Sequence, residues 1–375
     1  MIEKTKIKCK YNILLLFPSV VYKGGVVDFC RMLINYLSSD FHVDHFNIVT
    51  EVGKKGFIKR PLYLIPSVYK LIKSLISSHY DLIQLNPSFK EYSLIRDSIY
   101  LLIIIWLGLS KKTIVFFHGW NQDLAAKIGT NFFLRGVFRW VYKKAAIIFV
   151  LYNHCKAQLV NIGIEPHKIK ISTTMYESIE NKEEYSGKKK DGKLHILFLS
   201  RFLREKGMYI ASDVVRLLVD NGYKDFRIMF AGDGPEYENL KGYISRYGLE
   251  CFVDIPGYIS GKKKTDVFEQ NDIFLFPTYY GEGCPVVIME AMGAGQAVIS
   301  TPRGAIPDIV EHNVNGFIID SRDPRDFYEA VLRLLEDREL LNRMQELNRK
   351  KAQENYKAEV VTKKIESIYR SLIND

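Results

Sequence analysis

The strongest constraint on the fold is a repeated alternation of short apolar runs with segments of helical period. In the first half of the chain, runs typical of buried strands occupy Asn12–Phe17, Asp81–Leu85, Thr113–His118 and Ala146–Leu151. In the second half, such runs occupy Leu194–Ser200, Arg227–Ala231, Val253–Ile255 and Ile273–Phe276. Because helical segments separate the strands, the sequence predicts an α/β fold with two parallel sheets.

Helices are expected between and after these strands. Those with an apolar face or an apolar core are Pro66–Ser78, Ser93–Leu109, Tyr209–Asn221 and Glu236–Tyr247. The charged stretch Asp323–Asn355 is also expected to be helical, and Ala358–Ile373 is expected to form a last amphipathic helix.

A polar stretch from Tyr176 to Lys193 cannot bury one of its faces. We interpret it as a linker between domains at residues 1–180 and 190–355, and 375 residues are enough to give both domains a core. Parallel sheets bind ligands at the carboxyl ends of their strands. The functional site is therefore expected in a cleft where the two domains face each other.

The excess positive charge lies in the first half of the chain. Residues 1–185 contain 25 Lys and Arg against 14 Asp and Glu, whereas the remaining residues contain 28 against 29. A basic half indicates an anionic partner, such as a phosphorylated substrate or an anionic membrane surface, and solvated lysines are the alternative. Nucleic acid is not expected as a partner, because no recognition pattern accompanies the charge.

Cysteine usage and hydropathy indicate the compartment. The five cysteines are scattered without a C-x-x-C pair, which predicts neither a disulfide framework nor a zinc site and favours a reducing compartment. The longest apolar run, Ile99–Leu109, is too short for a membrane span, which needs about 20 residues. We expect a cytoplasmic protein that docks peripherally on the inner face of the cell membrane through the helices at 66–78 and 93–109.

Two glutamates mark the most informative segment. Glu282 and Glu290 enclose a turn that leads from a strand into a helix at Pro285, where the free N–H groups of Val286 and Val287 would face an anion. Eight residues are a little over two helical turns, so both carboxylates reach one ligand. A surface helix with unrelated glutamates is the alternative. The apolar surroundings of Glu290 favour a buried carboxylate with a ribose diol as its partner.

Further candidates follow three other strands. Arg201 and Lys206 come after the strand at 194–200 and suit a diphosphate, although a loop salt bridge is the alternative for Arg201. The pair Gly24 and Gly25 lets the backbone approach a ligand just before a helix. His118 ends a strand of the first sheet, where a structural histidine is equally plausible.

Several common chemistries lack their motifs. No two aspartates stand two residues apart, so the Asp-x-Asp metal clamp is absent, and no Walker loop or G-x-S-x-G elbow occurs. No metal or other cofactor is therefore expected. The charge of a diphosphate would be met by Arg201, Lys206 and helix N-termini.

Taken in order, these residues resemble the family-four retaining glycosyltransferases of the GT-B fold, also called glycosyl transferases group 1. The resemblance covers nearly the whole chain. Its most specific parts are Pro277–Glu290, Ala297–Thr301 and Gly304–Asp320. It implies two Rossmann-like domains facing across a cleft, with the acceptor on the first domain, the nucleotide sugar on the second, and a last helix, 356–375, packed back on the first.

The resemblance also implies roles for individual residues. Glu282 would contact the donor sugar, Glu290 the ribose, and His118 the transferred sugar. Together with Arg201 and Lys206 at the diphosphate, His118 and Glu282 form the expected catalytic set. The expected donor-binding residues are Gly24, Gly25, Arg201, Lys206, Tyr258, Ile259, Glu282, Gly283, Cys284, Pro285, Val286, Val287 and Glu290. Asn153 and Thr278 stand where the family often has serine, which leaves the acceptor open.

The expected function is retaining transfer of a sugar, without a metal, from a nucleotide diphosphate sugar to a glycan or lipid-linked acceptor in cell-surface polysaccharide synthesis. A UDP-sugar is the favoured donor. Same-face displacement is the favoured mechanism, and double displacement through a carboxylate is the alternative. A nucleotide-sugar epimerase or phosphorylase of the same fold, or a non-catalytic partner subunit, would be other functions for such a chain.

Overall fold

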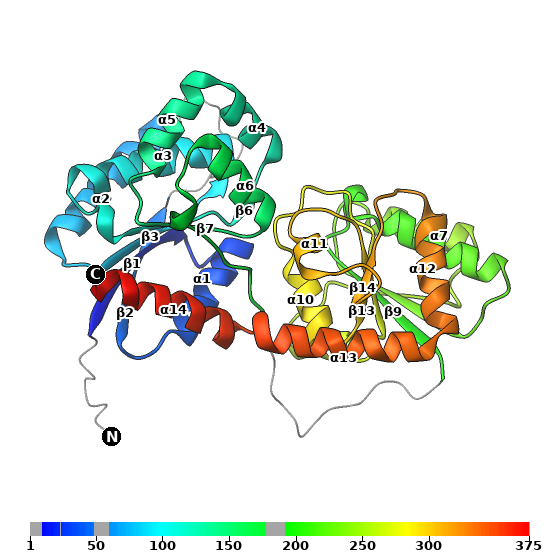
Figure 1. Ribbon diagram of the computed structural model, residues 1–375. Coiled ribbons are helices and arrows are strands. Elements are labelled where there is room, and N and C mark those ends of the chain that lie inside the picture. The colour runs from blue at the N-terminus through cyan, green and yellow to red at the C-terminus, as the bar shows by residue number, and fades with distance from the viewer. Residues whose placement is uncertain (1–9, 23, 49–59, 178–191, 375) are drawn as a thin grey trace. The chain divides into compact units, whose positions relative to one another are not determined.

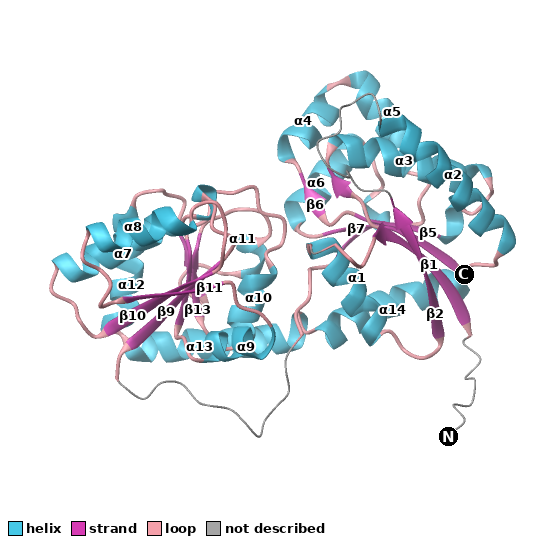
Figure 2. Cartoon of the chain, turned by 180° about the vertical axis from the view of Figure 1, so that it is seen from behind, coloured by secondary structure: helices cyan, strands magenta, loops and turns pink. Residues whose placement is uncertain are grey.

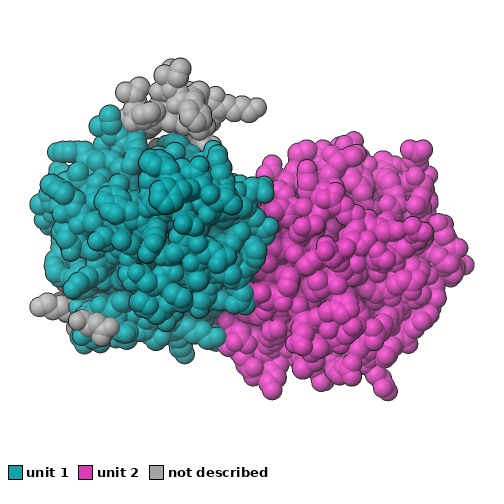
Figure 3. All heavy atoms as spheres, turned by 45° about the horizontal axis from the view of Figure 1, so that its top comes forward, with its two compact units in different colours: residues 1–174, 358–375 teal, residues 175–357 magenta. Residues whose placement is uncertain are grey.

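The computed structural model describes residues 10–22, 24–48, 60–177 and 192–374. The chain divides into two compact units (Figure 3). Unit 1 comprises Met1–Thr174 and Ala358–Asp375, and unit 2 comprises Met175–Lys357. Most of the expected linker, including the expected boundaries at 180 and 190, lies outside the described residues.

Unit 1 contains a parallel sheet with the strand order β2-β1-β3-β5-β7-β8. Its strands are β1 (Tyr11–Pro18), β2 (Phe41–Ile48), β3 (Leu82–Leu85), β5 (Thr113–Phe116), β7 (Ile147–Val150) and β8 (Ile169–Ile171). Four of the six were predicted. The edge strand β2 was missed because polar residues alternate along it and much of it is exposed, and β8 has only three residues.

Helices cover both faces of this sheet (Figures 1 and 2). One layer is formed by α2 (Arg60–Ser77), α3 (Glu91–Trp106), α4 (Gln122–Thr130), α5 (Phe132–Tyr142) and α6 (Asn153–Ile162). The other is formed by α1 (Gly25–Tyr36) and the C-terminal helix α14 (Ala358–Asn374), which pack on each other. Arg370 of α14 binds Asp40 at 2.7 Å, which fixes the end of the chain to unit 1.

Unit 2 contains a second parallel sheet, with the order β11-β10-β9-β12-β13-β14. Its strands are β9 (Leu194–Leu199), β10 (Phe226–Ala231), β11 (Val253–Gly257), β12 (Ile273–Phe276), β13 (Ala297–Ser300) and β14 (Gly316–Ile318). The first four confirm predicted strands, and the α/β fold class with two parallel sheets is confirmed. The chain order reverses between β9 and β12, and such a switch point is where open α/β sheets bind ligands.

The helices of unit 2 are α7 (Met208–Asp220), α8 (Tyr237–Arg246), α9 (Gly261–Glu269), α10 (Val286–Gly293), α11 (Ile306–Ile309), α12 (Pro324–Glu336) and α13 (Arg338–Asn355). The predicted helical stretch 323–355 is thus two helices. Asp337 separates them, because its side chain accepts a hydrogen bond from the Leu340 N–H and caps α13.

The apolar run Ile99–Leu109 lies mainly in α3, where Tyr100, Leu101 and Ile104 are fully buried. Within the described parts of the chain, no helix is long and apolar enough to cross a membrane.

Candidate active site

The loops that follow β9 and β12 meet at the switch point of unit 2. The Tyr279 N–H donates to the Glu205 carbonyl at 2.8 Å, which joins the two loops. Gly207 lies between them with φ +85°, and a Cβ there would be 2.0 Å from the Pro277 carbonyl oxygen. The close approach of the loops therefore requires glycine at this position.

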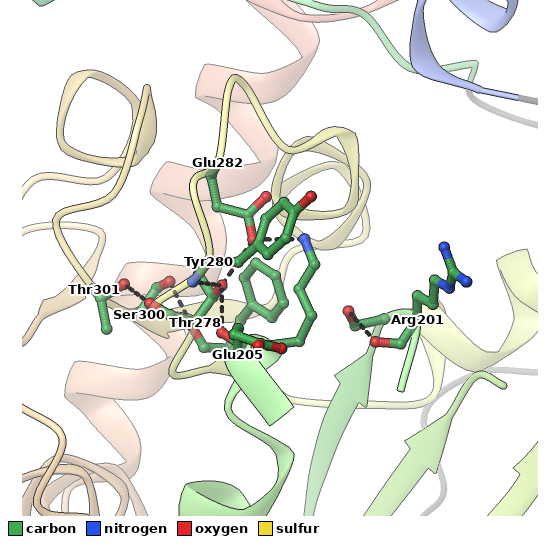
Figure 4. Close-up of polar contacts among 10 residues, drawn as sticks. Arg201, Glu205, Thr278, Tyr280, Glu282, Ser300 and Thr301 are labelled. Carbon is green, nitrogen blue, oxygen red and sulfur yellow. Dashed lines mark hydrogen bonds and ion pairs between the residues drawn. The ribbon is translucent and has the colours of Figure 1, made fainter. Parts of the chain in front are cut away.

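Lys206 and Glu282 form the centre of this arrangement (Figure 4). The Lys206 ammonium lies 2.7 Å from Glu282 Oε1, and both side chains are largely buried. The buried Thr278 hydroxyl donates to the same carboxylate oxygen at 2.8 Å. The Lys206 ammonium also lies 4.3 Å from the ring centroid of Tyr280. The sequence predicted both charged residues at one site, but it predicted neither their ion pair nor the part of Thr278.

Arg201 follows β9 directly but is oriented differently from Lys206. Its side chain is exposed and points away from Glu282, Thr278 and Tyr280 (Figure 4). Within the described part of the chain, its guanidinium has no hydrogen-bond or ion-pair partner. Lys206 and Arg201 therefore differ, because the Lys206 ammonium is bound by the Glu282 carboxylate whereas the Arg201 guanidinium is available to bind an anion.

The helix α10 begins one residue later than expected. Pro285 is its N-cap, with φ −72° and ψ 113°, and Val286 is its first residue. The N–H groups of Val286 and Val287 lie in the first turn, where helices leave donors without intrahelical acceptors. Gly304 supports the preceding turn, because a Cβ at that position would be 2.4 Å from the Glu282 carbonyl oxygen.

Glu290 has a partner that the sequence did not indicate. Lys264 of α9 lies 2.6 Å from Glu290 Oε1, whereas Glu290 Oε2 is buried without a hydrogen bond. Nothing in the sequence distinguishes Lys264 from its neighbours in the lysine run at 262–264. A buried acceptor without a donor costs free energy, so Oε2 is a natural position for a ligand hydroxyl.

The remaining donor-site candidates of unit 2 lie after β11 and in the turn before α10. Tyr258 and Ile259 follow β11, and Tyr258 is exposed whereas Ile259 is buried. Gly283 and the buried Cys284 lie in the turn before α10, and the Gly283 carbonyl accepts a hydrogen bond from Ala305 at 2.7 Å. In the described ranges, no three His, Cys, Asp or Glu side chains gather in a way that could hold a metal ion.

The candidates of unit 1 follow two strands of its sheet, β1 and β5. Gly24 is the N-cap of α1 and Gly25 is its first residue, and a Cβ at either position would meet no atom within 4 Å. His118 follows β5, with its ring stacked on Phe116 and its Nε2 atom 2.9 Å from Asn86 Oδ1. Burial lowers the pKa of His118 to about 3, so this imidazole is neutral near pH 7.

The part of the chain that contains the unit 2 site is similar to a known protein family. Residues 179–351 match the family described as glycosyl transferases group 1. The chain is 29% identical over 185 residues, 48% of this chain and 45% of the relative, to WcaL of Escherichia coli K12, a protein named for colanic acid biosynthesis. It is 30% identical over 190 residues, 48% of this chain and 43% of the relative, to the amylovoran biosynthesis glycosyltransferase AmsK of Erwinia amylovora. The match spans about half the length of these relatives.

Solved structures share the fold over nearly the whole chain. A complex of Anabaena Alr3699/HepE with UDP and glucose has a TM-score of 0.68 at 17% identity, covering 96% of this chain and all of that one. The lipopolysaccharide outer core galactosyltransferase WaaB has a TM-score of 0.70 at 15% identity, covering 96% and 99%. Residues 179–351, which carry Arg201, Lys206, Glu282 and Glu290, are thus similar to the glycosyl transferases group 1, and the chain has the GT-B fold.

Proposed function

We propose that this chain is a retaining glycosyltransferase that moves a sugar from a nucleotide diphosphate sugar to a glycan or lipid-linked acceptor. The observation that carries the proposal is the arrangement at the switch point of unit 2. There, Arg201, Lys206 and the N-terminus of α10 supply positive potential, and Glu290 Oε2 offers an unused buried acceptor. Such a set fits a diphosphate joined to a ribose.

A UDP-sugar is the proposed donor, and cell-surface polysaccharide synthesis is the proposed setting. The shared fold with a protein crystallised with UDP and glucose supports the donor. The relatives named for colanic acid and amylovoran synthesis support the setting. We propose that the protein acts at the cytoplasmic face of the cell membrane, where it would reach a lipid-linked acceptor.

The proposed mechanism is a same-face displacement. As the sugar leaves, negative charge grows on the departing diphosphate, and the nearby cations and helix N-terminus stabilise it without a metal. The departing phosphate oxygen then accepts the proton of the acceptor hydroxyl. Double displacement through a carboxylate is the alternative mechanism, although one oxygen of each carboxylate is already bound, Glu282 Oε1 by Lys206 and Thr278 and Glu290 Oε1 by Lys264.

Nucleotide binding gives the first test. In calorimetric titrations with UDP, GDP and ADP in EDTA, we expect one nucleotide to bind. Glu290→Gln should weaken that binding by roughly tenfold to a hundredfold, because a charged hydrogen bond to the ribose is lost. Glu238→Gln, an exposed carboxylate on α8 of the same unit, is the matched control and should bind as the wild type does. Equal affinity of the Glu290→Gln and wild-type proteins would contradict the assigned role.

An anionic membrane surface is the proposed docking partner of unit 1. The α5 helix buries Phe138, Val141 and Tyr142 but exposes an apolar face that lines a surface hollow of about 290 Å³. This face consists of Phe132, Phe133, Gly136, Val137 and Trp140. Exposed cations at Lys127, Arg135, Arg139 and Lys144 flank it. Aromatic side chains beside Lys and Arg are typical of segments that lie in a membrane interface.

The helices α2 and α3, which the sequence predicted to dock on the membrane, also expose aromatic side chains, Tyr69 and Trp106 respectively. In flotation with anionic liposomes, we expect the double variant Phe132→Ser, Phe133→Ser to be recovered several-fold less than the wild type. The double variant Tyr247→Ser, Leu347→Ser removes two exposed apolar side chains of unit 2 and is the control. Equal recovery of the wild type with neutral and anionic liposomes would refute anionic docking.

A further inference from the structure

A series of buried hydrogen bonds in unit 1 connects the C-terminal helix to His118. We call this series, formed by Tyr369, Gln84 and Asn86, the relay. The Tyr369 hydroxyl of α14 donates to Gln84 Oε1 at 2.5 Å, and Gln84 Nε2 donates to Asn86 Oδ1 at 2.8 Å. His118 Nε2 lies 2.9 Å from the same Asn86 oxygen. Tyr369 and Gln84 are fully buried and Asn86 is 3% exposed, so water does not compete for these bonds.

The direction of each bond in this chain is fixed by its neighbours. Asn86 Nδ2 lies near two backbone carbonyls, of Leu16 at 3.2 Å and of Gln84 at 3.4 Å, so this end of the amide must be the NH2 group. Asn86 Oδ1 is then an acceptor only. The facing His118 Nε2 must carry the proton, and His118 Nδ1 is left as a bare acceptor.

The hydroxyl of Tyr369 fixes the other end. With a donor on that side, Gln84 keeps its oxygen towards Tyr369 and its NH2 group towards Asn86. The reverse orientation of Gln84 would bring two amide oxygens together at Asn86. The Tyr369 hydroxyl therefore supplies the buried Gln84 oxygen with a donor and reinforces the orientation that the Asn86 oxygen imposes.

His118 Nδ1 has no hydrogen-bond partner in the described chain and is buried. An unpaired buried acceptor is unfavourable, and the surrounding structure maintains it. The His118 N–H of the backbone donates to the Pro87 carbonyl at 3.0 Å, and the short strands β4 (Ser88–Phe89) and β6 (Gly119–Trp120) pair just beyond. The loops that carry Asn86 and His118 are thus held together by their backbones as well as by the side-chain bond.

We propose that Gln84, Asn86 and Tyr369 are positioning residues that hold His118 as the Nε2–H tautomer, so that its bare Nδ1 accepts a hydrogen bond from a hydroxyl of the substrate sugar. The inference rests on the proposed transferase function for the identity of the ligand. The assignment of the tautomer is independent of that function. It makes His118 an acceptor in the reaction and excludes it as a proton donor through Nδ1.

The tautomer is tested by nitrogen NMR of the ligand-free full chain labelled with 15N-histidine at pH 7. We expect the wild type to show His118 as a single Nε2–H tautomer. Asn86→Leu should give a mixture of tautomers, because His118 Nε2–H loses the acceptor that selects it. Tyr369→Phe should give a smaller fraction of the second tautomer, because Gln84 loses one of its two partners. Tyr100→Phe is the matched control, since it removes another fully buried hydroxyl of unit 1, one that bonds Ser67 and not the relay. A proton on Nδ1 in the wild type, or an unchanged signal in Asn86→Leu, overturns the relay.

Kinetics test the link to the substrate. Tyr369→Phe should lower kcat by about tenfold, the value of one hydrogen bond, while nucleotide affinity stays at the wild-type value. Asn86→Asp retains an acceptor for Nε2–H and should keep more activity than Asn86→Leu. If Tyr369→Phe and Tyr100→Phe have the same kcat although His118 shows mixed tautomers in Tyr369→Phe, the proposed role of His118 at the sugar is overturned. A wild type with the expected tautomer but no turnover of any donor refutes the proposed function and leaves the relay standing.

Discussion

Replacing Lys206 by Met is expected to lower sugar transfer by roughly a hundredfold to a thousandfold, the usual effect of removing one group that stabilises developing charge. The variant keeps the length of the side chain but removes the ammonium that lies 2.7 Å from Glu282. Turnover is measured as nucleoside diphosphate released from the donor. Arg204→Met is the control, because Arg204 is an exposed neighbour that pairs with Glu236 instead.

Loss of Lys206 also leaves the buried Glu282 carboxylate without its counter-ion, which costs about 3–5 kcal/mol in folded proteins. The double variant Lys206→Met, Glu282→Gln separates the two effects. It should recover much of the stability, since neither charge remains, while turnover stays low. A single Lys206→Met variant with turnover within threefold of the wild type would show that the ammonium does not serve the reaction.

Gly207→Ala is expected to destabilise unit 2 by about 2–5 kcal/mol, the sum of a left-handed backbone and a forced displacement of packed atoms. The new methyl group would lie 2.0 Å from the Pro277 carbonyl oxygen, and it would separate the β9 and β12 loops. Since Lys206 precedes this residue and Glu282 follows Pro277, the variant should lose turnover as well.

Gly222→Ala provides a closely matched control for this prediction. Gly222 has φ +84°, compared with +85° for Gly207, but a Cβ at Gly222 would meet no atom within 4 Å. Its substitution should cost only the backbone contribution, about 1–2 kcal/mol. Urea denaturation followed by circular dichroism measures both variants. Equal denaturation midpoints would mean that the contact with Pro277 carries no constraint.

The alternation of strands and helices was readable from the sequence because the apolar period reflects burial, and strands such as β3, β5 and β12 are buried at every position. The strand β12, for example, was predicted with its observed bounds, Ile273–Phe276. The strand β13 was not assigned from its period, although it is buried throughout. The break at Asp337 was missed because a single capping residue does not interrupt the charged pattern on either side.

The residues of the candidate site were readable, but most of their contacts were not. Glu282 and Glu290 stood out because carboxylates are unusual beside so many apolar residues. Their partners Lys206 and Lys264 lie 76 and 26 positions away in the chain, and only the folded sheet brings them together. The sequence contained Lys206 as a candidate but gave no reason to choose Lys264 among the surface lysines.

The relay at His118 shows the same limit more clearly. Gln84 and Tyr369 are 285 positions apart in the chain, and neither has a local pattern that marks it as part of a site. From the sequence alone both would be assigned to the core, and both are fully buried. Their effect on His118 follows only from the directions of hydrogen bonds in the folded unit.

If unit 2 activates a nucleotide sugar without a metal, as proposed, the wild-type protein should turn over a donor when metals are chelated. The chain is incubated in EDTA with UDP-, GDP- and ADP-sugars, with and without lipid-linked acceptors, and proton NMR follows the anomeric signals. We predict release of one nucleoside diphosphate, with the anomeric configuration of the donor retained in the product. Release only after a divalent metal is added, or a product of inverted configuration, would contradict the account.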